Sequence, residues 1–162
     1  MPRCTSDTNL KQENLAPVLF LILSQVNVAY LLLPRLFPSE SNLLLRMQFL
    51  TAYHAINSLS EIQNDIDLGP ARSFSSRSIL TIVPNARKIR NVLAHYGLGE
   101  EKKYIGSNPS ALNDVIQGLS GMSKSKLLEM SNTQLREISE WSHSRISKSK
   151  LKDLRALFGD HT

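Results

Sequence analysis

The chain has 162 residues, of which 41% are hydrophobic and 20% are charged, a balance that indicates a globular domain and excludes an intrinsically disordered chain. Its 19 Lys and Arg outnumber 14 Asp and Glu, for a net charge of +5, which favours a polyanionic partner without requiring one. Cys4 is the only cysteine, so a disulfide framework and a cysteine-based zinc site are excluded within one chain, and we expect a cytoplasmic protein.

The apolar pattern predicts a single all-α domain. We expect a flexible polar lead at residues 1–11, one helical domain at 12–158 and a short tail at 159–162. Segments with the alternation of a strand are no longer than about four residues. The expected helices have short links, which favours an antiparallel bundle of four to six helices.

The first expected helix runs from about residue 13 to 33 and ends near Pro34 and Pro38, because proline lacks the N–H that continues a helix. It is strongly apolar, but polar residues between positions 24 and 27 leave it short of the roughly 20 apolar residues of a membrane span. The residues before it lack the basic region and cleavage site of a signal peptide. We therefore interpret it as a helix buried on more than one face, in a protein with no membrane role.

Two further helical segments precede residue 97. The second helix is expected from Ser39 or Ser41 to about Asp65, and its apolar stripe predicts a buried face of Leu45, Phe49, Ala52, Ile56, Leu59 and Ile66. The third segment carries an apolar face of Ile79, Leu80, Val83, Ala86, Ile89 and Leu93. Pro84 lies inside it, so the helix either kinks or restarts there, and Gly97 is well placed to end it.

The C-terminal third is expected to be helical as well. A short helix from about Ser110 to Leu119 follows a polar loop, and a long helical region extends from Gly121 to about Phe158. A new N-cap at Ser131-Asn132 is an alternative to one continuous helix. The basic residues between 124 and 155 form either a solvated face or a contact surface for a phosphate backbone.

The segment Arg90-Asn91-Val92-Leu93-Ala94-His95 concentrates groups suited to phosphate chemistry. Arg90 carries a fixed charge and a fork of donors that matches phosphate oxygens. Histidine exchanges protons near neutral pH, which makes His95 a candidate acid or base. Asn91 precedes His95 by four residues, on the same face of a helix, where it can orient the imidazole.

The spacing of Arg90 and His95 has a consequence for assembly. Five residues at about 100° each place the two side chains roughly 140° apart around a regular helix. They meet on one target only if the helix end unwinds or a second subunit supplies the complementary pair. The apolar first helix has more hydrophobic surface than one bundle face can cover, so we expect an isologous homodimer.

This segment resembles the signature of the HEPN superfamily (higher eukaryotes and prokaryotes nucleotide-binding). That signature is an Arg, four to six intervening residues and a His, usually with a polar residue directly after the Arg. Four residues separate Arg90 from His95, and Asn91 is the polar residue. The resemblance covers the motif closely and the rest of the chain only as a short all-α bundle.

The resemblance implies a metal-independent endoribonuclease without cofactors, acting in toxin–antitoxin or antiviral defence, in which two motifs meet at a dimer interface. It implies that the 2′-hydroxyl of RNA attacks the adjacent phosphate, that His95 handles protons, that Arg90 stabilises the transition state and that Asn91 positions His95 or the phosphate. Some members have an antitoxin that modifies a Tyr two residues after the His. Here Tyr96 is adjacent to His95 and residue 97 is Gly, which puts that kind of antitoxin in doubt.

Other residues near the motif are candidates for binding RNA phosphates: Arg87, Lys88, Tyr96, Lys102 and Lys103. Each also has a structural interpretation, Tyr96 as a ring over the helix end and the lysines as part of a solvated loop. His54 and His143 lack ligand partners at helical spacing, so we expect no metal site. The rival functions are a non-catalytic HEPN-like module that binds nucleotide or a protein partner, and an unrelated helical interaction domain.

Overall fold

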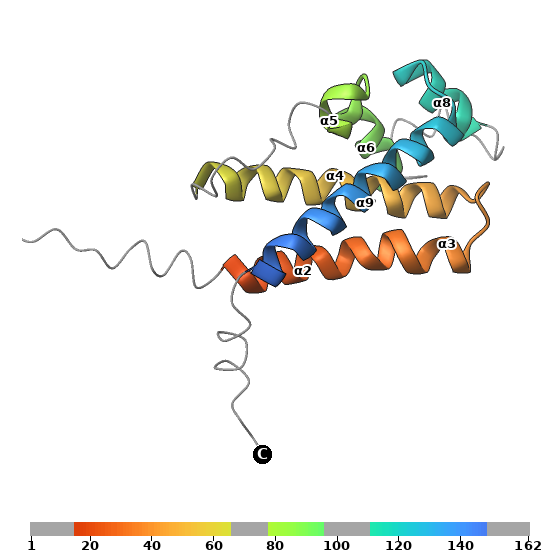
Figure 1. The fold of residues 1–162 in the computed structure, drawn as a ribbon. Coiled ribbons are helices and arrows are strands. Elements are labelled where there is room, and N and C mark those ends of the chain that lie inside the picture. Colours follow the sequence, from red (N-terminus) through yellow and green to blue (C-terminus); the bar gives the residue numbers. More distant parts are fainter. Residues whose placement is uncertain (1–14, 66–77, 96–110, 149–162) are drawn as a thin grey trace, which may run out of the picture.

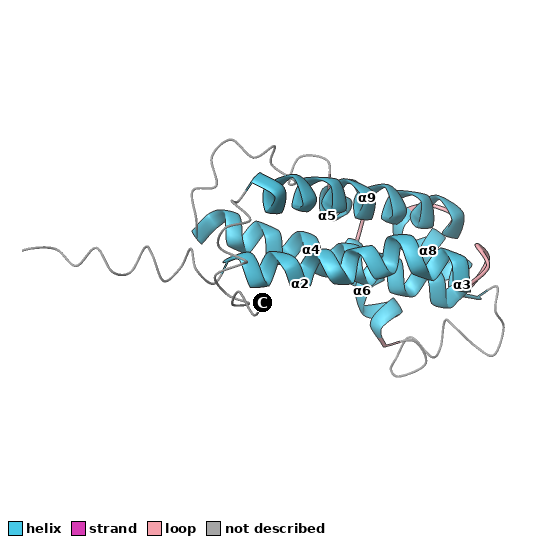
Figure 2. Ribbon diagram, turned by 60° about the horizontal axis from the view of Figure 1, so that its bottom comes forward, coloured by secondary structure: helices cyan, strands magenta, loops and turns pink. Residues whose placement is uncertain are grey.

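The computed structural model describes residues 15–65, 78–95 and 111–148, and every element in these ranges is helical (Figures 1 and 2). The expected all-α fold is therefore confirmed, whereas the lead and the tail lie outside the described residues. The elements are α2 (Leu15–Asn27), η1 (Val28–Leu32), α3 (Leu33–Leu36), α4 (Asn42–Asp65), α5 (Ile79–Ile82), α6 (Ala86–Ala94), α8 (Ala111–Ser120) and α9 (Lys124–Lys148).

Three long helical units form the body of the molecule. The continuous unit α2–η1–α3 lies beside α4 in the opposite direction, and α9 crosses both of them diagonally (Figure 1). The short helices α5, α6 and α8 lie on the other side of α4 from α2, with α6 packed between α4 and α8. This arrangement places the Arg90–His95 segment against α4 on one side and α8 on the other.

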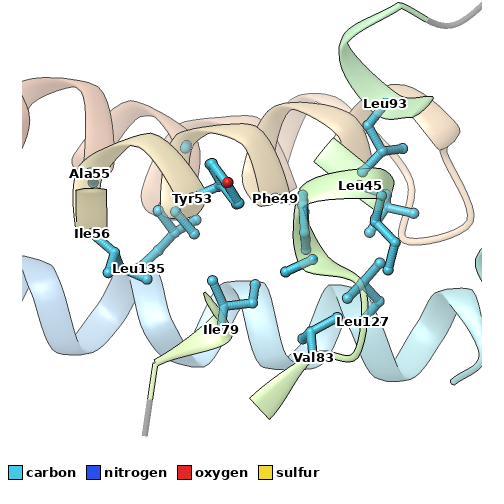
Figure 3. Close-up of a cluster of buried hydrophobic side chains, with 14 of the residues drawn as sticks. Leu45, Phe49, Tyr53, Ala55, Ile56, Ile79, Val83, Leu93, Leu127 and Leu135 are labelled. Carbon is cyan, nitrogen blue, oxygen red and sulfur yellow. The ribbon is translucent and has the colours of Figure 1, made fainter. Parts of the chain in front are cut away.

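The hydrophobic core lies where α4 and α9 meet the short helices. The stripe expected on the second helix is buried within α4, since Leu45, Phe49, Ala52, Ile56 and Leu59 are each at most 1% exposed; Ile66 lies outside the described residues. Side chains from three other helices and from the α5–α6 turn complete this cluster, among them Ile79, Val83, Leu93, Leu127 and Leu135 (Figure 3). Ser41 accepts a hydrogen bond from the N–H of Leu44 at the start of α4, as expected of an N-cap.

The first helix does not end at Pro34. It continues through a π-helical turn, η1, in which hydrogen bonds reach five residues back, as from the N–H of Leu33 to the carbonyl of Val28. Pro34 then lies in the first turn of α3, where a missing N–H costs little. In the π register the carbonyl of Ala29 would pair with the N–H that Pro34 lacks, and the side-chain amide of Gln48 donates to it instead, at 2.9 Å. The helical unit ends at Leu36, between Pro34 and Pro38 as expected, and passes the expected end at about residue 33 by one turn.

The first helical unit is buried on one face only, contrary to expectation. Its inner face packs on α4 and α9, and Ser139 of α9 donates a hydrogen bond of 2.7 Å to the side chain of Asn27. Its outer face is exposed and apolar, and at Val28 it meets Met47 of α4, since both side chains line one pocket. We call this surface the apolar face; it consists of Val18, Phe20, Leu21, Val28, Leu31, Leu32, Leu36, Leu43 and Met47.

The apolar face also revises the expectation about membranes. By length and composition, the stretch Pro17–Leu36 is sufficient to cross a membrane, and only 28% of its most apolar window is buried. The bonds made by Asn27 and by the carbonyl of Ala29 nevertheless tie this stretch to α9 and α4. It is therefore a core helix on one side and an exposed apolar surface on the other.

Helix α9 is continuous from Lys124 to Lys148, so the alternative of a new helix at Ser131-Asn132 is wrong. Ser131 is fully buried, and its hydroxyl donates to the carbonyl of Leu127 at 2.8 Å. Serine can satisfy its hydroxyl inside a helix in this way, by bonding back to the preceding turn. The residues from 149 onward lie outside the described ranges.

Candidate active site at the end of helix α6

A sharp break before α6 fixes the direction of the helix that carries the motif. Pro84 does not enter a helix: α5 ends at Ile82, and α6 starts at Ala86 after Asn85, which has a left-handed backbone with φ of 55°. The side-chain amide of Asn85 donates a hydrogen bond of 2.7 Å to the carbonyl of Leu119, at the end of α8. Asparagine is one of the few residues that adopt this conformation readily, so it both makes the turn and joins α6 to α8.

Arg90 lies on the side of α6 that faces α4. Its guanidinium carbon is 5.5 Å from the centre of the Tyr53 ring, a cation–π contact with a side chain that is only 9% exposed. The Nε atom of Arg90 is buried and makes no hydrogen bond within the part of the chain that the structure describes. Tyr53 in turn contacts the ring of the exposed His54 edge-on, with ring centres 5.6 Å apart. The guanidinium of Arg90 therefore lies over the ring of Tyr53, on the α4 side of α6.

His95 is the residue that directly follows α6, and its side chain is exposed. Its backbone leaves the helical conformation, with φ of −106° and ψ of 26°, while its N–H still donates to the carbonyl of Asn91 at 2.9 Å. The side chain of Arg46, from α4, donates to the carbonyl of Ala94 at 3.0 Å. Arg46 thus holds the last turn of α6 in place, and the imidazole of His95 is accessible to a substrate.

Asn91 lies on the other flank of α6, at a pocket of about 530 Å³ between α6 and α8. We call it the α6–α8 pocket; its walls include Lys88, Asn91 and Val92 of α6 and Asp114, Val115 and Leu119 of α8. Successive helical residues point about 100° apart, which accounts for the different surroundings of Arg90 and Asn91. The motif therefore presents Arg90 towards α4, Asn91 towards α8 and His95 to solvent.

The remaining predicted residues divide into two groups. Arg87 and Lys88 are exposed on α6, and Lys88 shares the α6–α8 pocket with Asn91. Tyr96, Lys102 and Lys103 lie outside the described residues. His143 is exposed on α9, and no group of three His, Cys, Asp or Glu side chains within the described ranges is arranged to hold a metal ion.

Sequence reasoning missed three residues of this region: Arg46, Tyr53 and Asp114. Arg46 and Tyr53 are seven residues apart on α4, so they share a helix face, which is the only signal that the sequence offers. That face contacts the motif only because α6 packs on α4, and no local pattern specifies this pairing. Asp114 is an ordinary acidic residue in the first turn of α8 until the packing of α8 on α6 places it beside Asn91.

Comparisons with protein-family models, with curated proteins and with solved structures found no match for this chain.

Proposed function

We propose that this chain is a metal-independent endoribonuclease of HEPN type that cleaves RNA as a homodimer. The observation that carries the proposal is the Arg90-Asn91-x3-His95 motif at the end of α6, with His95 exposed and Arg90 held against Tyr53. An exposed imidazole and a guanidinium that two subunits bring to one phosphodiester suit proton transfer and charge stabilisation. The net charge of +5 favours association with RNA.

The proposed reaction needs no group that the chain lacks. The 2′-oxygen of the RNA forms a bond to the adjacent phosphorus, and the bond from phosphorus to the 5′-oxygen of the next nucleotide breaks. His95 accepts the proton of the 2′-hydroxyl, and the imidazolium so formed donates a proton to the leaving 5′-oxygen. Arg90 stabilises the extra negative charge on the phosphorane-like transition state. The products are a 2′,3′-cyclic phosphate and a 5′-hydroxyl.

The second subunit is proposed to dock on the apolar face. The residues of this face on α4, Leu43 and Met47, are neighbours in sequence of Arg46, which holds the end of α6. An isologous contact here covers the exposed apolar side chains of both subunits, and the proposed reaction requires that it also bring the two motifs to one interface. Burial in such a dimer is compatible with a cytoplasmic protein, and a cognate antitoxin or defence partner would then regulate it.

The proposal is tested by cleavage of a labelled RNA with Arg90→Ala and His95→Ala proteins. We expect each substitution to lower the cleavage rate at least about a hundredfold, the scale of a lost acid–base or charge-stabilising group. His95 is exposed, so the melting temperature of His95→Ala should stay close to that of the wild type. Arg90 is partly buried against Tyr53, so the melting temperature of Arg90→Ala is measured alongside, and cleavage is compared at a temperature at which both proteins are folded. Matched controls are His143→Ala and Arg136→Ala, which remove an exposed histidine and an exposed arginine from α9.

Three outcomes contradict the proposal. Equal cleavage by wild-type, Arg90→Ala and His95→Ala proteins would separate any activity from the motif. Loss of cleavage in EDTA would reject the metal-independent reaction. Products with a 5′-phosphate would reject attack by the 2′-hydroxyl.

The rival function is a non-catalytic HEPN-like module that binds a nucleotide or a protein partner. The α6–α8 pocket favours the nucleotide-binding version, since its volume falls within the range of about 300–1,000 Å³ of ligand sites. Growth on expression separates the two functions. A nuclease is toxic as the wild type and harmless as His95→Ala, whereas a binding module affects growth equally in both forms.

A further inference from the structure

The α6–α8 pocket has the features of a site for a flat, partly apolar ring. Val92 is buried, and the partly buried Val115 and Leu119 face it from α8, so the pocket has apolar walls on both helices. The bond from Asn85 to the carbonyl of Leu119 ties the start of α6 to the end of α8. Because these walls are held in place without a ligand, binding of a ring would cost little conformational entropy of the protein.

The polar groups of the pocket differ in kind between its two walls. Lys88 offers only donors and a positive charge from α6, whereas the carboxylate of Asp114 offers only acceptors from α8. The amide of Asn91 offers both, and it belongs to the motif itself. A ligand that satisfies all three needs a pair of donors on one edge and acceptors or negative charge elsewhere.

Among the RNA bases, guanine fits this set best. Its Watson–Crick edge presents two adjacent donors, N1–H and the N2 amino group, which a carboxylate accepts in a bidentate pair. Its O6 and N7 atoms are acceptors that lysine recognises. Adenine and cytosine place an acceptor beside their amino group, and uracil places carbonyls on both sides of its single N–H, so each sets an acceptor against the carboxylate.

We propose that the α6–α8 pocket is a guanine-binding subsite, with Asp114 as the residue that determines the base. The inference rests on the proposed function and deepens it, since it makes the ribonuclease selective for RNA with a guanine near the cleaved bond. Asn91 connects the guanine subsite with the proposed cleavage site, because it lines the pocket and lies four residues before His95.

The test measures binding with the His95→Ala protein, which leaves the RNA intact. Fluorescence anisotropy compares oligouridine RNAs that contain one guanine, one adenine or one cytosine. We expect the guanine RNA to bind at least about tenfold more tightly, the discrimination typical of a bidentate base contact. Asp114→Asn should remove this preference, because it exchanges one acceptor oxygen for a donor and keeps the shape. The amide matches the donor and acceptor on the edge of adenine and carries no negative charge, so the adenine RNA should bind at least as tightly as before.

Gly118, on the wall of the same pocket, provides a matched pair of variants. A Cβ atom built at Gly118 meets nothing within 4 Å, so Gly118→Ala leaves the pocket open, whereas Gly118→Leu extends into it. We expect Gly118→Ala to keep the preference for guanine and Gly118→Leu to lose it. Gly118→Ala should fold, since its Cβ atom enters open space, and thermal unfolding of Gly118→Leu is measured alongside to show that it is folded.

The outcomes separate this inference from the proposed function. Equal binding of guanine and adenine RNAs, or an unchanged preference in Asp114→Asn, overturns the subsite even if the wild type cleaves RNA. A preference for guanine that depends on Asp114, in a protein that cleaves no RNA, supports the subsite and overturns the nuclease. Guanosine monophosphate distinguishes a guanine within RNA from a free nucleotide. If it binds as tightly as the guanine RNA, the pocket is a site for the free nucleotide.

Discussion

Tyr53 and Arg90 meet across the α4–α6 contact, and this pair decides where the charge of the motif lies. A guanidinium 5.5 Å from the centre of a nearly buried ring is held by the face of the ring and by the loss of competing water. Tyr53→Phe keeps that face, whereas Tyr53→Leu removes it and leaves Arg90 free to adopt other rotamers. We therefore expect Tyr53→Phe to cleave RNA at a rate close to the wild type.

For Tyr53→Leu we expect the cleavage rate to fall about tenfold, which corresponds to a desolvated cation–π contact of roughly 1–2 kcal/mol. The substitution also disturbs the core, so thermal unfolding is measured alongside, at a temperature at which both variants are folded. A loss of charge positioning lowers kcat more than it raises KM. Equal cleavage rates for the two folded variants would show that the ring does not position Arg90.

At the scale of elements, the sequence predicted the helices and most of their ends, but not the path of the backbone at Pro34 and Pro84. The expected ranges of α4 and α8 agree with the structure, since an N-cap at Ser41 and a strong apolar stripe are local signals. The continuation of the helix past Pro34 could not be predicted, because it depends on a distant partner. The carbonyl that Pro34 leaves unpaired is satisfied by Gln48, from another helix, and no property of residues 28–36 reveals that donor.

The hydrogen bond from Gln48 to the carbonyl of Ala29 predicts an energetic coupling between Gln48 and Pro34. Gln48 is 1% exposed, so Gln48→Met keeps most of the volume but leaves the carbonyl of Ala29 buried without a donor. We expect the free energy of unfolding to fall by about 1–3 kcal/mol. In a Pro34→Ala background the restored N–H can donate instead, so the same substitution should cost less, with a coupling of at least about 0.5 kcal/mol.

A double-mutant cycle in urea measures this coupling. The control is Gln117→Met, which replaces an exposed glutamine on α8 and should change the free energy of unfolding by no more than about 0.5 kcal/mol. An identical cost of Gln48→Met with and without Pro34 would mean that the amide of Gln48 does not substitute for the missing N–H.

At the scale of the whole molecule, the sequence located the motif but not its surroundings. Arg90, Asn91 and His95 could be recognised because their types and spacing are local. Their neighbours Arg46, Tyr53 and Asp114 come from α4 and α8, and only the packing of α6 between those helices brings them to the motif. The apolar surplus of the first helix was also visible in the sequence, whereas its separation into a packed face and an exposed face depends on where α9 and α4 lie.

The exposed apolar face predicts that the protein is a dimer in solution. Leu32, at 47% exposure, belongs to this face, whereas Ile82 is 45% exposed on α5, apart from it. Sedimentation velocity should therefore give a dimer for the wild type and for Ile82→Glu, and a monomer for Leu32→Glu, because a buried unpaired charge at an interface is costly. A wild-type monomer that instead floats with lipid vesicles would contradict the dimer and identify the apolar face as a membrane surface.

The proposed active site takes Arg90 from one subunit and His95 from the other. This arrangement predicts that two inactive variants complement each other. A dimer of one Arg90→Ala chain and one His95→Ala chain retains one intact pair of two. Mixing the two inactive proteins in equal amounts and allowing subunit exchange makes half of the dimers mixed, so the mixture should recover about a quarter of the wild-type cleavage rate. Introducing Leu32→Glu into both chains should abolish that recovery. If the mixture recovers no activity although subunit exchange has been demonstrated, Arg90 and His95 of the same chain form one site. The departure of the His95 backbone from the helical conformation would then have to bring the two side chains together within a single subunit.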